Sequence, residues 1–176
     1  DLPEPVNVYG LSKLDGENID KKENPNALIL RVNFFGWGPA YRQSLSDWIL
    51  TSLAQARRIT LYDNVIFNPL NVSEIIEATH DLLSIGAEGI YNLANSEAIS
   101  KYDFGLELAD RFKLDRHHIA HGSYCSNNTV PRPLNMTLAN NKFLNKFQGT
   151  RFSIKRSIAK LSEEREKKGL LSSLEK

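Results

Sequence analysis

The chain has 176 residues, enough to bury a substantial core, and its 41% hydrophobic and 24% charged residues are typical of a globular domain. Its 22 basic and 21 acidic side chains nearly cancel and form no basic stripe, which argues against a nucleic-acid partner. No apolar run approaches the ~20 residues that cross a bilayer, which argues against a membrane protein. The single cysteine, Cys125, cannot form an internal disulfide. We therefore expect a reducing compartment, the cytoplasm.

The start of the chain suggests that it belongs to something longer. The first residue is Asp1 and the single methionine is Met136, whereas a natural reading frame begins with methionine unless it is processed. We therefore expect the chain to be a piece of a larger protein.

The first third of the chain alternates between helical and strand patterns. Residues 6–21 predict a helix, because Val6, Tyr9, Lys13, Gly16 and Glu17 fall at three- and four-residue steps along one face. Residues 27–32 form an apolar run without alternation, which predicts a strand covered on both faces, as in a parallel sheet. Residues 33–39 are rich in glycine and aromatic side chains and predict a loop. The patterns that follow predict a helix over 44–57 and short strands over 59–62 and 65–67.

The rest of the chain continues the alternation. Asn71 offers a cap for a helix that runs to residue 84, and Ser100 caps the next helix. Residues 89–93 predict a strand, residues 117–149 a loop-rich section, and residues from 153 onward a charged terminal helix that frays. The order of these elements predicts an α/β protein.

The sharpest chemical feature is the sequence Tyr9-Gly10-Leu11-Ser12-Lys13. A spacing of four places the phenol of Tyr9 and the ammonium of Lys13 on one face of a helix. A nearby positive charge favours the phenolate, which helps a phenol to exchange a proton with a carbonyl or carbinol oxygen. Such pairs also arise by chance on solvated helix faces, so the context has to decide.

The context resembles a known family. The segment VNVYGLSKLDGE at residues 6–17 resembles the active-site helix of the extended short-chain dehydrogenases/reductases. It is most similar to the dTDP-4-dehydrorhamnose reductase group, where NVYG-x-(T/S)-K-L-x-GE is typical. The resemblance continues, in order, through LILR at 28–31, NPLNVSE at 68–74, GIYNLAN at 89–95, SKYDF at 100–104 and PRPLN at 131–135.

The resemblance implies the C-terminal part of a Rossmann-type NAD(P)-binding fold together with a smaller substrate-binding region. It implies hydride transfer between NADPH or NADH and a nucleotide-linked 4-keto-6-deoxysugar. Tyr9 would donate the proton to the keto oxygen, and Lys13 would favour the phenolate and hold the nicotinamide ribose. Asn33 and Phe34 would meet the nicotinamide and the sugar. Arg132 is a candidate for the diphosphate, because a planar guanidinium suits paired phosphate oxygens, or else a surface arginine held between two prolines.

The chain also departs from the family pattern. The rhamnose-type reductases usually read Arg-Thr-Ser-Trp where this chain has Arg31-Val32-Asn33-Phe34. Phe34 therefore replaces the tryptophan expected against the sugar, and Trp37 follows three residues later as either a substrate contact or a packing residue. The family's Gly-x-x-Gly-x-x-Gly turn and its catalytic Ser/Thr belong upstream of the tyrosine and have no counterpart here. We expect the chain alone neither to bind NAD(P) tightly nor to turn over.

Two other functions remain open at this stage. An epimerase or dehydratase of the same fold would share Tyr9 and Lys13, and a non-catalytic relative could serve as a regulatory subunit. The three histidines His117, His118 and His121 have no cysteine or carboxylate at ligand spacing except Asp115, so we predict no metal site.

The resemblance also suggests a division of the chain. Residues 1–66 would be the last part of the Rossmann-type domain with the catalytic helix. Residues 67–150 would supply the remaining sheet and the substrate-binding elements, and residues 151–176 a terminal charged helix or tail. An open sheet edge, left where further strands should pair, favours association, so a homodimer is a further expectation.

Overall fold

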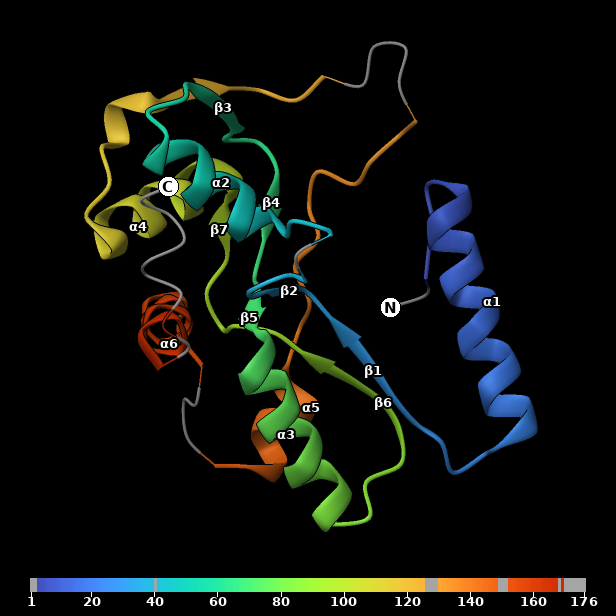
Figure 1. Cartoon of the computed structure of the whole chain (residues 1–176). Helices are drawn as coiled ribbons and strands as arrows, with labels where there is room; N and C mark the ends of the chain where they lie inside the picture. Colours follow the sequence, from blue (N-terminus) through green and yellow to red (C-terminus); the bar gives the residue numbers. More distant parts are fainter. Residues whose placement is uncertain (1–2, 40, 126–129, 149–151, 168, 170–176) are drawn as a thin grey trace.

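The computed structural model describes residues 3–39, 41–125, 130–148, 152–167 and 169. Helices and short strands alternate along these residues, and three of the four strand pairs that they form are parallel. The predicted α/β fold class is therefore confirmed. Figure 1 shows two packed halves, each built around a parallel strand pair.

The lower half in Figure 1 is built on β1 (Leu28–Val32) and β6 (Gly89–Leu93), which pair in parallel along their whole length. Helices α3 (Val72–Ser84) and α5 (Asn141–Lys146) contribute further side chains to its core. The buried residues of this core are Leu70, Ala78, Leu82, Tyr91, Leu93, Phe143 and Phe152.

The upper half is built on a second parallel pair, β3 (Ile59–Tyr62) and β8 (Ile119–Gly122). It is covered by α2 (Leu45–Ala54) and α4 (Lys101–Phe112). Helix α4 approaches β3 closely at Gly105, where a Cβ atom would lie 2.2 Å from a methyl carbon of Leu61. The buried side chains shared by these elements include Ile49, Leu50, Leu53, Ile59, Leu61, Phe104, Leu108, Ala109 and Ile119.

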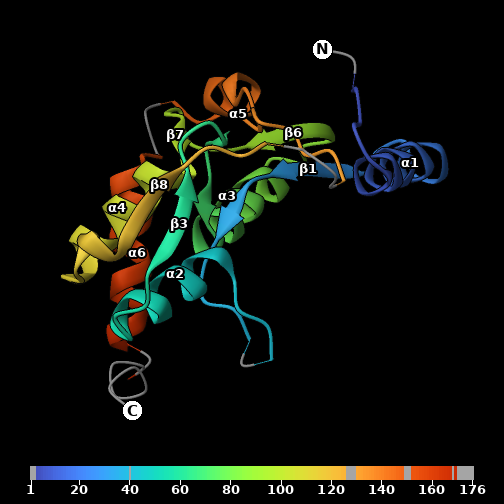
Figure 2. The same cartoon turned by 90° about the horizontal axis from the view of Figure 1, so that it is seen from above.

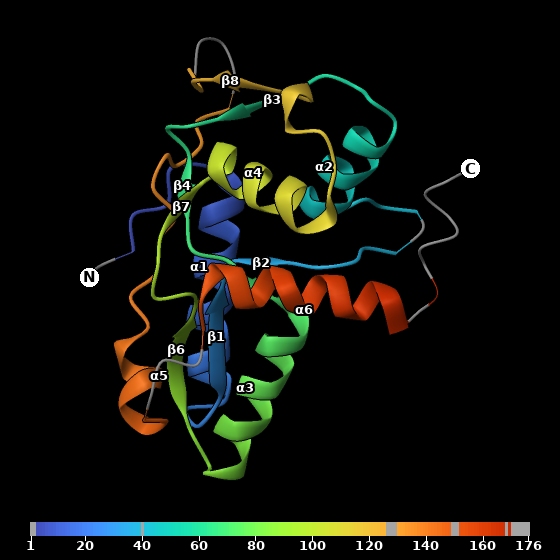
Figure 3. The same ribbon diagram turned by 90° about the vertical axis from the view of Figure 1, so that its left-hand side faces the viewer.

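Short strands and one long helix join the two halves. Strand β2 (Phe34–Phe35) pairs in parallel with β5 (Leu70–Asn71), and β4 (Ile66–Phe67) pairs antiparallel with β7 (Ile99–Ser100). Helix α6 (Ile154–Lys167) lies between the halves in Figure 3. It packs against α4 above and β5 below, and its apolar side chains enter the upper core.

Helix α1 (Val8–Glu23) lies to one side of both halves, as Figures 1 and 2 show from two directions. It begins two residues later than predicted, because Asn7 is the N-cap and its side chain accepts a hydrogen bond from the Gly10 N–H. None of the sixteen described residues of α1 is buried. The helix therefore contributes side chains to neither core.

Several sequence predictions on this fold were wrong. Strand β1 was expected to be covered on both faces, but each of its residues is only half-buried, and among the described residues β6 is the one strand that pairs with it. The expected loop 33–39 contains β2, because Phe35 is drawn into the upper core. The section 117–149 is loop-rich as predicted, with β8 and α5 as its strand and helix and a 3-10 turn at Arg116–His118 at its start. The predicted helix 44–57 ends at Ala54, since Ala56 has a left-handed φ of 51°.

The predicted caps agree with the structure. Asn71 caps α3 by accepting from the Ser73 N–H, and Ser100 caps α4 by accepting from the Asp103 N–H. The terminal helix begins at Ile154, next to the predicted start, and most of the expected tail beyond it lies outside the described residues.

Candidate active site

The predicted catalytic pair lies on the first turns of α1. Tyr9 and Lys13 are one helical turn apart, and the Lys13 ammonium lies 5.3 Å from the centroid of the Tyr9 ring. Both side chains are exposed, with Tyr9 at 72% of its full accessible surface. The phenol and the ammonium therefore lie together on a helix face that is open to an incoming molecule.

Helix α1 is fixed to β1 by one charged contact. The Arg31 guanidinium donates two hydrogen bonds to the Glu17 carboxylate, at 2.7 and 2.6 Å, in the bidentate arrangement. These bonds lower the pKa of Glu17 and raise that of Arg31. Since Glu17 is one turn beyond Lys13, the contact fixes the direction in which the catalytic face points.

Two asparagines bond to the segment 131–136, one from the start of α1 and one from the end of β1. The Asn7 side chain donates a 2.8 Å hydrogen bond to the Pro131 carbonyl, directly beside Arg132. The Asn33 side chain, one residue after β1, donates a 2.5 Å hydrogen bond to the Met136 carbonyl. The structure thus brings the start of α1, the end of β1 and the arginine-bearing segment together. Phe34, next in the chain, is 63% exposed.

The segment 131–136 forms one wall of a cavity of about 650 Å³. The opposite walls come from α2, β3 and the first residue of α4. Tyr62 and Tyr124 also line the cavity, and their rings form an edge-to-face pair with centroids 5.6 Å apart. Arg132 and Lys101 supply two positive charges, and the cavity is large enough for a nucleotide.

Trp37 lies elsewhere, against α6 and α4. Its indole N–H donates a 3.0 Å hydrogen bond to the Leu161 carbonyl, and its ring contacts Phe112 edge-to-face at 6.1 Å. These are the contacts of a packing residue, so Trp37 is left out of the site that we propose below.

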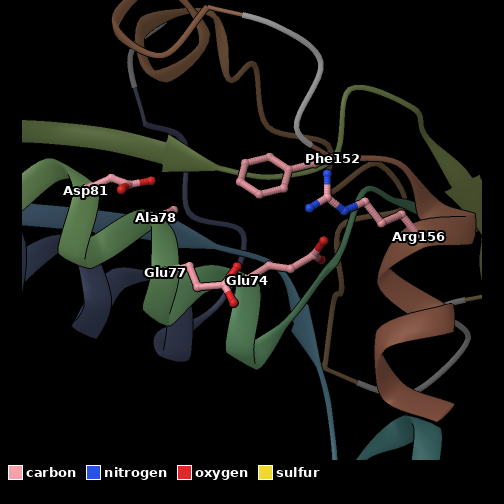
Figure 4. Close-up of a pocket in the computed structure, with 6 residues that line it drawn as sticks. All are labelled: Glu74, Glu77, Ala78, Asp81, Phe152 and Arg156. Atoms are coloured by element: carbon pink, nitrogen blue, oxygen red, sulfur yellow. The ribbon is translucent and has the colours of Figure 1, made fainter. Parts of the chain in front are cut away.

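The acidic cavity shown in Figure 4 has a different character. It measures about 440 Å³ and is lined by Glu74, Glu77, Ala78, Asp81, Phe152 and Arg156. Glu74 is 1% exposed, and burial raises its pKa even though the Ser157 hydroxyl and the Asn71 N–H both donate to it. Its carboxylate closes the capping box of α3, so we assign it to the fold.

The three histidines do not converge. His118 faces Asp115 at 3.8 Å, whereas His121 faces Asp63 at 3.0 Å. Within the described part of the chain, no three His, Cys, Asp or Glu side chains gather as metal ligands. No helix there is both long and apolar enough to cross a bilayer.

Sequence reasoning missed Lys101, Tyr62 and Tyr124 as cavity residues. One signal was available for Lys101, which occupies the first position of α4. The helix dipole disfavours a positive charge at the first position of a helix, so a lysine there indicates a role other than helix stability. The two tyrosines gave no comparable signal, because their partnership depends on the pairing of β3 with β8.

The fold matches that of solved Rossmann-like reductases. Among solved structures, the chain is similar to dTDP-4-dehydrorhamnose reductase from Bacillus anthracis in complex with NADP, with a TM-score of 0.83 and 18% identity. That alignment covers 93% of this chain and 58% of the other. The reductase from Clostridium acetobutylicum gives a TM-score of 0.81 at 19% identity, covering 94% and 58%. At these identities, the likeness establishes the fold.

The sequence itself identifies the family. Residues 1–166 match the RmlD substrate binding domain, and the chain belongs to this family, which confirms the predicted resemblance. A probable low-salt glycan biosynthesis reductase, Agl14 of Haloferax volcanii, is 30% identical over 113 residues, or 62% of this chain and 38% of that protein. Methionine adenosyltransferase 2 subunit beta of Xenopus laevis is 27% identical over 155 residues, or 78% and 43%. The chain spans less than half the length of both curated relatives.

Proposed function

We propose that the protein containing this chain reduces the keto group of a nucleotide-linked 4-keto-6-deoxysugar with NADPH or NADH. The observation that carries the proposal is the open Tyr9–Lys13 face of α1, whose N-cap is bonded to the segment bearing Arg132. The hydrogen bond from Asn7 to Pro131 therefore joins the helix that carries the acid–base pair to the wall of the cationic cavity. Reductases of this fold and family support the assignment.

Each proposed residue has a defined task. The Tyr9 phenol donates its proton to the keto oxygen, and the Lys13 ammonium stabilises the phenolate that remains. Lys13 is also suited to hold the nicotinamide ribose, because it is exposed and no carboxylate pairs with it among the described residues. Asn33 and Phe34 would border the nicotinamide and the sugar. The cofactor supplies the hydride to the carbonyl carbon.

The cavity between β3 and the segment 131–136 would hold the nucleotide. Arg132 suits the diphosphate, since its fork of N–H donors matches paired phosphate oxygens. The Tyr62–Tyr124 pair offers aromatic surface of the kind against which a base packs. Residues 1–66 would then belong to the cofactor side, residues 67–150 mainly to the substrate side, and residues 151–176 to a terminal helix and tail. We place this activity in the cytoplasm.

The proposal is tested on the full-length protein by following NADPH absorbance with a dTDP-4-keto-6-deoxysugar. Tyr9→Phe removes the proton donor and should lower kcat about 10²- to 10⁴-fold. Tyr41→Phe, which changes another exposed tyrosine, should leave the rate unchanged. If the wild type binds NADPH but oxidises none with any 4-keto sugar nucleotide, the reductase assignment is wrong.

A second candidate rests on a different observation. Relatives named as a subunit of methionine adenosyltransferase align over most of this chain, so the protein could act by binding a partner enzyme. Size-exclusion chromatography of the full-length protein with purified methionine adenosyltransferase separates the two functions. A stable complex that forms without sugar-dependent NADPH oxidation would favour the subunit, whereas oxidation without a complex favours the reductase.

A further inference from the structure

Lys101 occupies an unusual place in the wall of the 650 Å³ cavity. It is the first residue of α4, and its backbone N–H is used by a hydrogen bond to the Val65 carbonyl. Its ammonium lies 3.3 Å from the centroid of Phe67, a buried ring beneath the cavity wall. The aromatic face stabilises a cation on one side and leaves the ammonium N–H donors to other acceptors.

Those acceptors are not supplied by the described part of the protein. Within it, neither Lys101 nor Arg132 forms an ion pair or a side-chain hydrogen bond, and the cavity lining contains no carboxylate. A partly buried ammonium without an anion carries a desolvation cost that a bound anion would offset. Two cations without a counter-ion among the described residues line the same cavity, and they therefore point to a ligand with more than one negative charge.

We propose that Lys101 is a substrate-binding residue that takes the diphosphate of the sugar nucleotide together with Arg132. This inference rests on the proposed function and adds a second phosphate ligand to it, from a helix that sequence reasoning did not assign to the site. Arg132 approaches from the segment tied to the catalytic helix, and Lys101 from the packed upper half. The diphosphate would thus bridge the two sides of the substrate cavity by charge.

The ionisation of Lys101 supplies a signature. Burial lowers the pKa of Lys101 to about 8, and a bound anion would raise it again. Affinity for the anion should therefore be highest below pH 8 and fall as the pH rises through that value. Because a lysine with this pKa loses its charge between pH 7 and 9, the expected loss of affinity is roughly tenfold.

Other titratable groups surround the cavity and need a control. Tyr62 from β3, Tyr124 after β8 and Arg132 face it, while α2 contributes uncharged side chains to the wall. On α4 itself, Asp103 accepts a hydrogen bond from the Ser100 hydroxyl. A Lys101→Arg variant keeps all of these groups and a permanent charge, so the difference between its pH profile and that of the wild type isolates Lys101.

The test is isothermal titration of the full-length protein with dTDP and with inorganic pyrophosphate, at saturating NADP⁺ so that the cofactor's own phosphate site is filled. At pH 7, Lys101→Met should weaken dTDP binding about tenfold or more, and Lys101→Arg should restore most of it. Between pH 7 and 9, the affinity of the wild type should fall roughly tenfold relative to that of Lys101→Arg, whose profile carries the ionisation of the ligand's own phosphates and of the other groups around the cavity. Methionine keeps the length of the chain over Phe67, and a circular dichroism melt confirms that the variant is folded.

The outcomes separate this inference from the reductase assignment. Equal dTDP affinity of wild type and Lys101→Met would overturn the inference, while the sugar-dependent oxidation of NADPH would be unaffected. Absence of dTDP and pyrophosphate binding by the wild type would also overturn it. Lysine-dependent binding of dTDP in a protein that reduces no 4-keto sugar would uphold the inference and remove the proposed activity.

Discussion

Helices α1 and α4 border the proposed site from opposite sides, and they are held in place by different means. Of the described residues of α4, Phe104, Gly105, Leu108 and Ala109 are buried, and the helix packs against α2, α6 and β3. Helix α1 is longer, yet none of its residues is buried. A helix without a buried apolar face draws little stability from packing, and a helix of this length is marginal alone.

The difference divides the site into a rigid and a weakly supported side. Lys101 rests on the core through α4, whereas Tyr9 and Lys13 depend on the Asn7 cap and on the bond between Glu17 and Arg31. The free edge of β1 lies beside them, since among the described residues this strand pairs with β6 alone. The catalytic half of the site would therefore gain its order from whatever packs against α1 and β1.

The largest expected effect comes from the core of the upper half. Phe104 is fully buried, and its ring centroid lies 5.0 Å from that of Phe35 and 5.3 Å from that of Phe67. Phe104→Ala should lower the free energy of unfolding by about 3–5 kcal/mol, measured by urea denaturation. Leu11→Ala on α1, where the side chain is 48% exposed, should change it by less than about 0.5 kcal/mol. Comparable losses in both variants would contradict the contrast between the helices.

The contact between α1 and β1 gives the next prediction. Glu17→Gln removes the charge from the bidentate pair with Arg31 and should lower the free energy of local opening of α1 by about 1–2 kcal/mol. Hydrogen exchange should accelerate in the amides of α1 and stay unchanged in those of α4. The matched variant Glu23→Gln changes an exposed carboxylate at the end of the same helix. Equal acceleration in both variants would show that the ion pair does not hold the helix.

The parts of the fold that sequence predicted well are those that depend on local signals. The caps at Asn71 and Ser100 were found because a short polar side chain satisfies N–H groups two or three residues away. The catalytic helix was found because Tyr9 and Lys13 carry a family motif at helical spacing, and the family is now established. Their role stays a prediction.

The parts that sequence missed depend on distant partners. The burial of β1 could not be read from its apolar run, because the run does not say which neighbours cover it. The same holds for Phe35, which becomes a core residue through contacts with α4. The cavity escaped notice because Tyr62, Lys101 and Arg132 meet only after the strands have paired. A sequence motif predicted Arg132 as a binding residue, but no motif indicated the other residues that line the cavity.

A smaller effect should follow from the N-cap of α1, where Asn7 has two separable contacts. Its side chain accepts from the Gly10 N–H and donates to the Pro131 carbonyl. Asn7→Ala loses both contacts and should cost α1 about 1 kcal/mol. Asn7→Ser keeps a capping oxygen and should recover most of the helix stability without the bond to Pro131. Helix amide exchange reports the cap, and the KM for the sugar nucleotide reports the bond to the arginine-bearing segment. Equal KM values for Asn7→Ser and the wild type would show that this bond does not position Arg132.

Acid should affect the two regions in opposite directions, because their carboxyl groups are perturbed in opposite directions. The hydrogen bonds from Arg31 lower the pKa of Glu17, so its contribution to stability is present above the unfolded value of 4.5 and is lost as the pH falls through the folded one. Burial raises the pKa of Glu74, so the folded protein takes up that proton more readily than the unfolded chain. Glu74 thus stabilises the fold below its unfolded pKa, and this contribution is lost as the pH rises through its folded pKa.

The two carboxyls can be separated by urea midpoints and hydrogen exchange between pH 7 and 3, because the folded-state pKa of Glu17 lies below 4.5. Relative to Glu74→Gln, which cannot titrate, the wild type should gain global stability as the pH falls. Relative to Glu17→Gln, the wild type should lose protection in α1 toward the acid end of this range. The glutamine at position 74 keeps the shape of the side chain beside Ser157. A difference in stability between wild type and Glu74→Gln that stays constant with pH is therefore not informative, whereas a difference that changes with pH reports the titration of Glu74. Parallel plots of stability against pH for wild type and Glu74→Gln would contradict a raised pKa of Glu74. If protection from hydrogen exchange falls equally in α1 and α4 at acid pH, the two regions unfold as one unit.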